Sequence, residues 1–248
     1  MKNKVVSIYG YGRFGRLWAG ILAKDFKVKV YSRRGLQKED VEYCVEIADE
    51  KDIFNCDALF FCVAISSFEE VLKQSKSFHN ENTVYFDTCS VKVEPARWMK
   101  ENLPANSQLI ATHPMFGPDS YSPKEKMPMV MCNVRAENTE FDFWVDYFSS
   151  RNMNIEVMTP DKHDESAAYS QGITHYIGRV LSDLNLSPTM IDTLGYKKLM
   201  EIIEQTCNDA WQLFVDLQKY NPYTRKMRTD LHESIEKIYA YLNSDSKE

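Results

Sequence analysis

The sequence lacks the patterns by which several large classes of protein are recognised. No segment approaches the ~18 consecutive apolar residues of a membrane span, and the N-terminus shows no apolar stretch of a signal peptide. The net charge is −6 and no long block of Lys and Arg is present, which argues against nucleic acid or an anionic membrane as the main partner. The six cysteines form no C-x-x-C pair and no metal-ligand spacing. We therefore expect a cytoplasmic protein with reduced thiols and no bound metal.

What is present is enough apolar sequence for a core, in an alternating pattern. The chain has 248 residues, of which 44% are hydrophobic, so it can form one large domain or two modest ones. Strands are expected over 5–9, 27–31, 58–63, 83–87, 109–111, 129–132 and 155–157. A helix is expected near 67–76, with Ser66 and Ser67 as candidate caps, and Pro95 suits the opening turn of another. This alternation predicts an α/β fold with a doubly wound sheet of the Rossmann type.

The pattern changes at Thr159-Pro160, a strong helix start because Thr suits the N-cap and Pro the first helical position. Beyond it only helical patterns follow, over about 160–185, 196–219 and 223–242. We expect two domains, 1–158 and 159–248. The second is all-α and has little core of its own, so we expect a homodimer formed through the C-terminal helices.

A glycine string follows the first expected strand. Gly10-Tyr11-Gly12-Arg13-Phe14-Gly15 matches G-x-G-x-x-G between a strand and a helix, the context that the dinucleotide-binding fingerprint requires. Gly10 allows the tight turn, Gly12 lets the backbone approach a pyrophosphate, and Gly15 lets the helix pack closely on the strand. The helix N-terminus offers N–H groups to phosphates.

The end of the second strand indicates which dinucleotide is bound. An NAD site usually has an acid about 20 residues past the glycines, but this chain has Ser32-Arg33-Arg34 there. A hydroxyl and two guanidinium groups suit a 2′-phosphate, so we predict NADP; the alternative is a pair of solvated surface arginines. The expected cofactor-binding residues are Gly10, Gly12, Arg13, Phe14, Gly15, Ser32, Arg33, Arg34, Val63 and Ala64.

Two polar segments follow strands, where the carboxyl ends of a doubly wound sheet hold reacting groups. One contains Ser90 and Lys92, and the other contains His113 in a stiff Pro-rich loop. A histidine with an ordinary pKa near ~6.5 suits the acceptance of a hydroxyl proton at neutral pH. Ser90 could orient His113 or share its proton.

A polar stripe lies on the helix that starts at Pro160. Gln171 and His175 are four residues apart and share a face, and Arg179 continues it one turn later. Gly172 and Gly178 beside them allow close packing. We therefore expect this stripe to line a cleft.

Together these motifs resemble the prephenate/arogenate dehydrogenase family over nearly the whole chain. The resemblance is carried by the glycine string, Asp87-x-x-Ser90-Val91-Lys92, the segment His113 to Pro118, and His163-Asp164 with His175 after it. It implies that His113 is the catalytic base, Ser90 its hydrogen-bonding partner and His175 a residue of the substrate pocket.

The chain departs from the bacterial pattern of this family, in which a Tyr-Arg pair is followed eight residues after its Arg by a second Arg for the ring carboxylate. Here Tyr196-Lys197 and Gln205 occupy those positions, as in the short plant-type arogenate dehydrogenases, which the segment 195–209 resembles. Arogenate-preferring members of that type carry an acid at the position of Asp209. Candidates to bind the ring carboxylate are Lys92, Arg179 and Lys197. The expected substrate-binding residues are His175, Asp209, Gln171 and Lys92.

The resemblance implies an NADP-dependent oxidative decarboxylation of arogenate to tyrosine that needs no metal. The alternatives are a prephenate dehydrogenase that makes 4-hydroxyphenylpyruvate, an NADP-dependent dehydrogenase of another small hydroxy acid, and a regulatory protein that binds NADP without catalysis.

Overall fold

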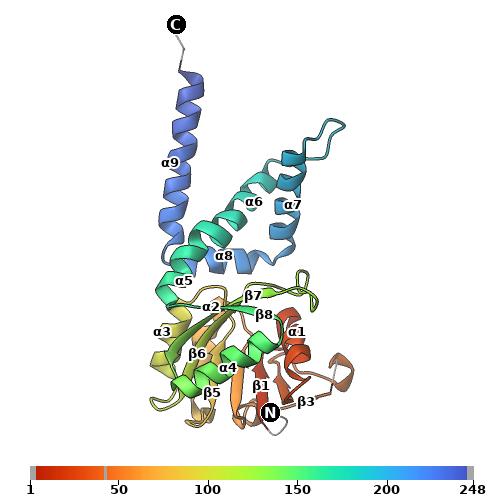
Figure 1. Cartoon of the computed structure of the whole chain (residues 1–248), viewed down its shortest axis with the longest axis vertical. Coiled ribbons are helices and arrows are strands. Elements are labelled where there is room, and N and C mark those ends of the chain that lie inside the picture. The colour runs from red at the N-terminus through yellow and green to blue at the C-terminus, as the bar shows by residue number, and fades with distance from the viewer. Residues whose placement is uncertain (1–3, 42–43, 245–248) are drawn as a thin grey trace. The chain divides into compact units, whose positions relative to one another are not determined.

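The computed structural model describes residues 4–41 and 44–244, which fall into two compact units (Figure 1). The first unit is Met1–His163 and the second is Asp164–Glu248. The sequence predicted a boundary near residue 158, and the division falls inside the helix that begins there.

An eight-stranded sheet forms the centre of the first unit, in the order β3-β2-β1-β4-β5-β6-β7-β8. The strands are β1 Val5–Tyr9, β2 Lys27–Tyr31, β3 Val45–Ile47, β4 Ala58–Phe61, β5 Val84–Asp87, β6 Gln108–Pro114, β7 Met127–Arg135 and β8 Met153–Val157. Neighbouring strands are parallel except β6 and β7, which are antiparallel. This arrangement confirms the predicted Rossmann-type sheet, while β3 was missed because it is short and its residues are partly or fully exposed.

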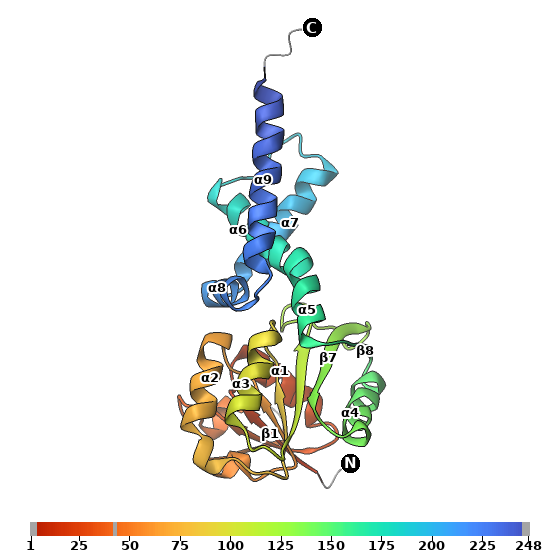
Figure 2. The same cartoon turned by 90° about the vertical axis from the view of Figure 1, so that its left-hand side faces the viewer.

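Helices cover both faces of this sheet. The helices α1 (Arg13–Leu22) and α4 (Asn138–Ser150) meet on one face, where the ring centroids of Trp18 and Phe148 lie 5.3 Å apart. The helices α2 (Ile65–Gln74) and α3 (Val93–Asn102) lie on the opposite face (Figure 2). Short 3₁₀ turns occupy Lys38–Asp40, Asp52–Phe54 and Lys76–Phe78. The sheet is therefore buried on both sides, as its apolar strands require.

The start of α2 differs from the prediction. Ala64 is the N-cap and no side chain caps the helix, so Ser66 and Ser67 lie inside the first turn rather than before it. The helix begins at Ile65, two residues earlier than expected, and the Ile65 side chain is buried. Pro95 does lie in the first turn of α3, as predicted.

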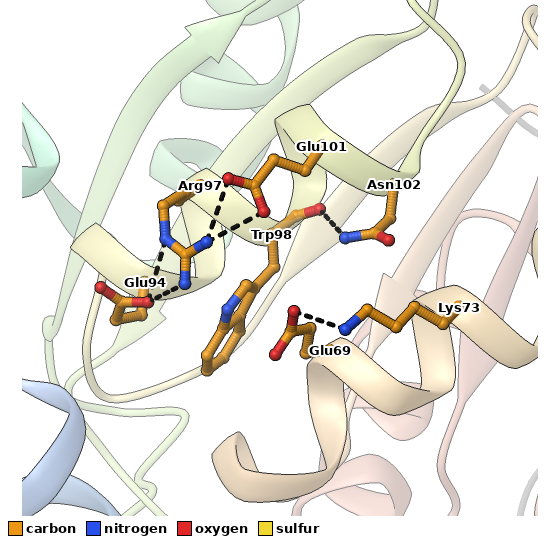
Figure 3. A network of polar contacts seen from close by, with 7 residues as sticks. All are labelled: Glu69, Lys73, Glu94, Arg97, Trp98, Glu101 and Asn102. Carbon is orange, nitrogen blue, oxygen red and sulfur yellow. Dashed lines mark hydrogen bonds and ion pairs between the residues drawn. The ribbon is translucent and has the colours of Figure 1, made fainter.

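The outer faces of α2 and α3 carry exposed ion pairs (Figure 3). Lys73 pairs with Glu69 at 2.7 Å, and Arg97 lies between Glu94 at 2.5 Å and Glu101 at 2.9 Å. Exposed pairs of this spacing contribute little to helix stability, because water and salt screen the charges. This surface is therefore an ordinary solvated helix face.

The second unit is helical. Its elements are α5 (Pro160–Ala167, which begins in the first unit), a π-helical turn (Ala168–Gly172), α6 (Ile173–Asp183), α7 (Leu194–Asn208), α8 (Trp211–Tyr220) and α9 (Thr224–Asn243). Thr159 caps α5 as predicted, since its Oγ1 accepts a hydrogen bond from the Lys162 N–H at 3.2 Å. None of the described helices is long and apolar enough to cross a membrane.

Two glycines bring the helices of this unit into close contact. A Cβ at Gly178 would lie 2.1 Å from the Thr206 Oγ1, so α6 and α7 can approach this closely only with glycine there. A Cβ at Gly172 would lie 3.2 Å from the Thr224 Cγ2, and the Gly172 carbonyl accepts a hydrogen bond from the Gln218 side chain at 2.8 Å. The predicted close packing beside the polar stripe is confirmed.

The helix predicted over 196–219 is wrong in one respect: it is two helices, α7 and α8. Asp209 and Ala210 have extended backbone angles, with φ −70° and ψ 146° at Asp209. The Arg179 guanidinium donates hydrogen bonds to the carbonyls of Thr206 at 2.9 Å and Asp209 at 2.7 Å. These carbonyls lose helical partners at the break, and Arg179 satisfies them.

Candidate active site

The glycine string lies where the strand order reverses. The strands β1 and β4 are neighbours, but the chain continues from them to opposite sides of the sheet, which makes this the point at which doubly wound sheets bind ligands. Gly10 has φ +109°, and a Cβ there would lie 2.3 Å from the Cys62 carbonyl oxygen. The turn after β1 therefore packs directly against the chain that leaves β4, which leads into Val63 and Ala64.

The other two glycines have different roles. A Cβ at Gly15 would lie 2.0 Å from the Gly10 carbonyl oxygen, so glycine there is required by packing. A Cβ at Gly12 would meet no atom within 4 Å, so protein packing does not explain this glycine. Gly12 is also the N-cap of α1, whose first turn has no side-chain cap. An open approach to uncapped N–H groups is what a dinucleotide pyrophosphate requires.

The first helical residue beside these N–H groups has a side-chain partner. Arg13 forms an exposed ion pair with Asp119 at 2.6 Å. Phe14 packs its ring on Trp18, with centroids 5.6 Å apart. Both side chains thus have contacts of their own within the first unit.

The Ser32-Arg33-Arg34 segment forms a tight turn after β2. The Gly35 N–H donates to the Ser32 carbonyl at 2.9 Å, and Gly35 has φ +74°. Arg33 and Arg34 are exposed, and neither guanidinium takes part in a hydrogen bond or ion pair within residues 4–41 and 44–244. The two charges are therefore available to an anion.

A carboxylate that sequence reasoning missed lies near this turn. Glu50 accepts a hydrogen bond from the Tyr9 hydroxyl at 2.5 Å, and the Tyr9 and Tyr31 rings lie 4.9 Å apart. Burial and the Glu50 carboxylate raise the pKa of both Tyr9 and Tyr31. Glu50 follows β3, which was not predicted, and so no signal in the sequence linked it to the ends of β1 and β2.

His113 lies at the carboxyl end of β6 and is 3% exposed. Its Nδ1 lies 2.8 Å from the Nε2 of His163, which is also 3% exposed. Burial, and then electrostatic effects of the neighbouring His163 and Lys92 side chains, hold the pKa of His113 well below its usual value. The imidazole is therefore neutral at neutral pH and can accept a proton.

The sequence predicted Ser90 as the partner of His113, but the structure places His163 at the Nδ1 of that ring. The Ser90 Oγ is buried and has no hydrogen-bond partner among the described residues. The sequence marks His163 only as part of a motif, because a residue fifty positions from His113 gives no sign of their contact.

Lys92 was expected to contact substrate, and the structure gives it another role. Its side chain is fully buried, forms an ion pair with Asp87 and donates to the Thr112 carbonyl at 2.6 Å. The Thr112 hydroxyl in turn donates to the Asp87 carbonyl at 2.6 Å. This network ties the end of β5 to the end of β6, and so it holds the segments of Ser90 and His113 together. We therefore leave Lys92 out of the proposed substrate-binding residues.

Within the second unit, His175 and Asp209 come together. The His175 Nε2 lies 3.9 Å from the Asp209 Oδ2, while the His175 Nδ1 is buried without a hydrogen-bond partner in the described residues. Burial lowers the pKa of His175, with a smaller opposing effect of Asp209. The Oε1 of Gln171 is likewise buried without a partner among the described residues. These polar atoms are suited to a ligand.

The two other cationic candidates differ in their surroundings. The Arg179 guanidinium lies over the rings of Trp211 and Phe214, 5.4 and 5.7 Å from their centroids, besides binding the two carbonyls at the helix break. Lys197 is exposed on α7. Arg179 is thus committed to internal contacts. The surroundings of Lys197 give no support for a role in binding the ring carboxylate.

The fold and these motifs define a Rossmann-type nucleotide-binding unit followed by a helical unit. Residues 24–134 match the family model "Prephenate dehydrogenase, nucleotide-binding domain", and residues 180–248 match "TYRAAT1-like, C-terminal domain". In both units the chain is thus similar to the prephenate/arogenate dehydrogenase family.

Individual relatives agree with this family. The chain is 31% identical to arogenate dehydrogenase 1, chloroplastic, of Arabidopsis thaliana, over 96% of this chain and 39% of the relative. It is 32% identical to arogenate dehydrogenase 2, chloroplastic, of the same plant, over 75% of this chain and 54% of the relative. The fold matches the crystal structure of prephenate dehydrogenase from A. aeolicus with a TM-score of 0.76 at 15% identity, covering 100% of this chain and 93% of that one. The chain thus spans about two fifths to a half of the length of the two plant relatives.

Proposed function

We propose that this chain catalyses the NADP-dependent oxidative decarboxylation of arogenate to tyrosine. The observation that carries the proposal is the buried, neutral imidazole of His113 at the carboxyl edge of a nucleotide-binding sheet. The plant relatives named above are arogenate dehydrogenases. The resemblance of the segment 195–209 to the plant-type enzymes supports the same substrate.

His113 is proposed to act through its Nε2 atom. This nitrogen accepts the proton of the ring hydroxyl. Loss of that proton favours departure of a hydride from the ring carbon that bears the hydroxyl. NADP, when bound, supplies the hydride acceptor. The ring carboxylate leaves as carbon dioxide, its electron pair completes the aromatic ring, and His113 returns the proton to the phenol oxygen. The anionic substrate raises the proton affinity of the imidazole while it is bound.

The proposed cofactor residues keep the roles expected from the sequence. The N–H groups after Gly12 would hold the pyrophosphate, and Ser32, Arg33 and Arg34 would hold the 2′-phosphate of NADP. Their support is the open space at Gly12 and the two unpaired guanidinium groups on the described surface. A free 2′-hydroxyl would offer these groups no charge to bind.

The proposed substrate residues are Ser90, Gln171, His175 and Asp209. The first three have a buried polar atom without a partner among the described residues, which a ligand can satisfy. The Asp209 carboxylate is proposed to bind the side-chain ammonium of arogenate, a group that prephenate lacks.

A single assay tests the proposal. The purified protein is incubated with arogenate and with prephenate, each with NAD and with NADP, and the appearance of reduced nicotinamide is followed by absorbance. We expect the highest kcat/KM with arogenate and NADP. A higher kcat/KM with prephenate would mean that prephenate, not arogenate, is the substrate. Activity only on another hydroxy acid, or NADP binding without turnover, would overturn the proposed function.

We also propose a homodimer in the cytoplasm. Apolar side chains of α9 lie exposed in the described unit, among them Ile235, Ile238, Tyr239 and Leu242, and a second copy of the chain could cover them. Light scattering should give twice the chain mass, and Ile238→Asp should shift it toward one chain. The six free thiols fit a reducing compartment.

A further inference from the structure

The contact between His113 and His163 constrains where protons can reside. The Nδ1 of His113 and the Nε2 of His163 are 2.8 Å apart, and the rings meet nearly edge to face with centroids 5.0 Å apart. At this separation one nitrogen must carry the hydrogen and the other must offer a lone pair. Two neutral rings can satisfy this requirement in only two ways.

The two arrangements have opposite consequences for catalysis. If His163 donates from Nε2, the Nδ1 of His113 is the acceptor and its Nε2 carries the proton, so that Nε2 cannot accept another. If His113 donates from Nδ1, its Nε2 holds a lone pair and can act as the base. Only the second arrangement is compatible with the proposed chemistry.

We infer that His163 is a positioning residue that holds His113 in its Nδ1–H tautomer by accepting a hydrogen bond at Nε2. This inference rests on the proposed function, in which His113 is the base. The effect is the one that a carboxylate has on the imidazole of a serine protease, with a neutral acceptor in its place.

The backbone around His163 fixes the acceptor in place. The His163 N–H donates to the Thr159 carbonyl at 3.0 Å in the first turn of α5, whose start is set by the Thr159 cap. Because both rings are 3% exposed, bulk water does not compete for the Nδ1 hydrogen. The tautomer is therefore determined by protein groups.

The groups that surround His113 keep its ring neutral. Burial lowers the pKa of His113, and His163 and Lys92 lower it further. The Lys92 charge is balanced locally by Asp87, with which it forms a buried ion pair. Protonation of His113 by solvent is thus disfavoured, whereas a proton delivered by bound substrate strengthens the Nδ1–H bond to His163.

Two variants of His163 test whether its side chain acts as a hydrogen-bond acceptor or only fills space. His163→Leu removes the lone pair, and we expect kcat to fall about 10- to 100-fold while KM and the Kd for NADP stay near the parent values. His163→Gln can offer its amide oxygen near the position of Nε2, and we expect it to keep kcat within a few fold. His79→Leu is the matched control, because His79 is a half-buried histidine bound to Ser75 at 2.9 Å, and we expect it to keep full turnover.

Nitrogen NMR of the parent chain provides a readout that does not depend on turnover. With ¹⁵N-labelled histidine, and His113→Asn for assignment, the His113 Nδ1 should carry the hydrogen and Nε2 should be bare. In His163→Gln the same tautomer should persist. If His163→Leu does not fold, the NMR spectra of the parent chain and of His163→Gln still determine the tautomer of His113.

Three results would overturn the inference. They are a hydrogen on the His113 Nε2 in the parent chain, an unchanged kcat in His163→Leu, and equal kcat losses in the Gln and Leu variants. Failure of the proposed function is distinguishable, since it would abolish turnover of arogenate and prephenate in the parent chain while leaving the NMR result intact.

Discussion

The guanidinium of Arg179 on α6 donates a 2.7 Å hydrogen bond to the main-chain carbonyl of Asp209, the residue at which α7 ends. A second bond from the same nitrogen reaches the Thr206 carbonyl at 2.9 Å. One side chain therefore stabilises the break between two helices and fixes the backbone of the residue proposed to recognise the substrate ammonium.

Arg179→Lys should destabilise this break. Lysine keeps the charge but lacks the planar group that binds two carbonyls while it lies over Trp211 and Phe214. We expect a loss of about 2 kcal/mol in the free energy of unfolding, from a charged hydrogen bond and its ring contacts. Urea unfolding measures this loss, and the preference for arogenate over prephenate should decrease with it.

Arg225→Lys is the matched control for that experiment. Arg225 is exposed on α9 in the same helical unit, and its side chain makes no contact that the argument above invokes. Equal stability losses in the two variants, or an unchanged arogenate preference in Arg179→Lys, would contradict the role given to Arg179.

His113→Asn tests the proposed base. The Asn amide occupies the position of Nδ1 and can still donate to His163, but nothing replaces Nε2. We expect turnover to fall roughly 10²- to 10⁴-fold, the usual contribution of a general base, with NADP binding unchanged. Steady-state kinetics and a cofactor titration measure the two quantities. Retention of most activity across neutral pH would exclude His113 as the base.

The first unit could be predicted from the sequence largely because its signals are local. Buried strands such as Ala58–Phe61 are continuous apolar runs, and the glycine string lies between a strand and a helix as its chemistry requires. The partner of His113 could not be predicted in this way. His163 reaches it through the tertiary fold, and residue spacing holds no record of such a contact.

Buried histidines should make the protein sensitive to acid. Burial lowers the pKa of His79 to about 4, holds that of His113 well below its usual value and lowers that of His175. The unfolded chain binds protons at these side chains below about pH 6.5, whereas the folded chain does so only at lower pH. The free energy of unfolding should therefore be independent of these groups above about pH 7 and fall as the pH drops below about 6.5.

Urea unfolding at about pH 8, 6.5 and 5 measures this slope. His79→Gln should flatten it, because one group with a lowered pKa is removed. His232→Gln, at an exposed position on α9, serves as the control. A stability that rises as the pH falls through this range would contradict the prediction.

Ser32→Asp combined with Arg33→Ala tests the cofactor. The double variant removes a guanidinium from the turn after β2 and supplies a carboxylate that can accept from a free ribose hydroxyl. We expect kcat/KM to move from NADP toward NAD. Lys124→Ala, at an exposed position elsewhere in the unit, is the control. Unchanged NADP affinity in the double variant would mean that these side chains do not contact the cofactor.

In the helical unit, the break at Asp209, the residue proposed to recognise the substrate ammonium, was harder to predict. The segment 196–219 contains no Pro or Gly, so its local preference is for one helix. The break at Asp209 depends on Arg179, which lies thirty positions earlier and supplies the hydrogen bonds that the interrupted backbone needs. Tertiary contacts here override local propensity.

Arogenate and prephenate share the ring, its hydroxyl and its carboxylate, so a site can distinguish them only at the side chain. Arogenate carries an ammonium there and prephenate a keto oxygen. The Asp209 carboxylate is 38% exposed, and its ion-pair neighbour within the described residues is His175 at 3.9 Å, a distance too long for a hydrogen bond. Asp209 can therefore accept a charge-assisted hydrogen bond from an ammonium, while it repels the electron-rich keto group.

Asp209→Asn should consequently weaken the use of arogenate and improve the use of prephenate. The loss of one charged hydrogen bond is worth ~1.5–3 kcal/mol, about tenfold to a hundredfold in the ratio of the two kcat/KM values. Asp192→Asn, a change of the same kind in the loop before α7, should leave the ratio at the parent value. Because both substrates need His113 equally, the variant should alter their ratio without abolishing turnover. A ratio equal to that of the parent in Asp209→Asn would show that this carboxylate does not face the ligand, and the proposal of arogenate as substrate would lose its basis in the chain.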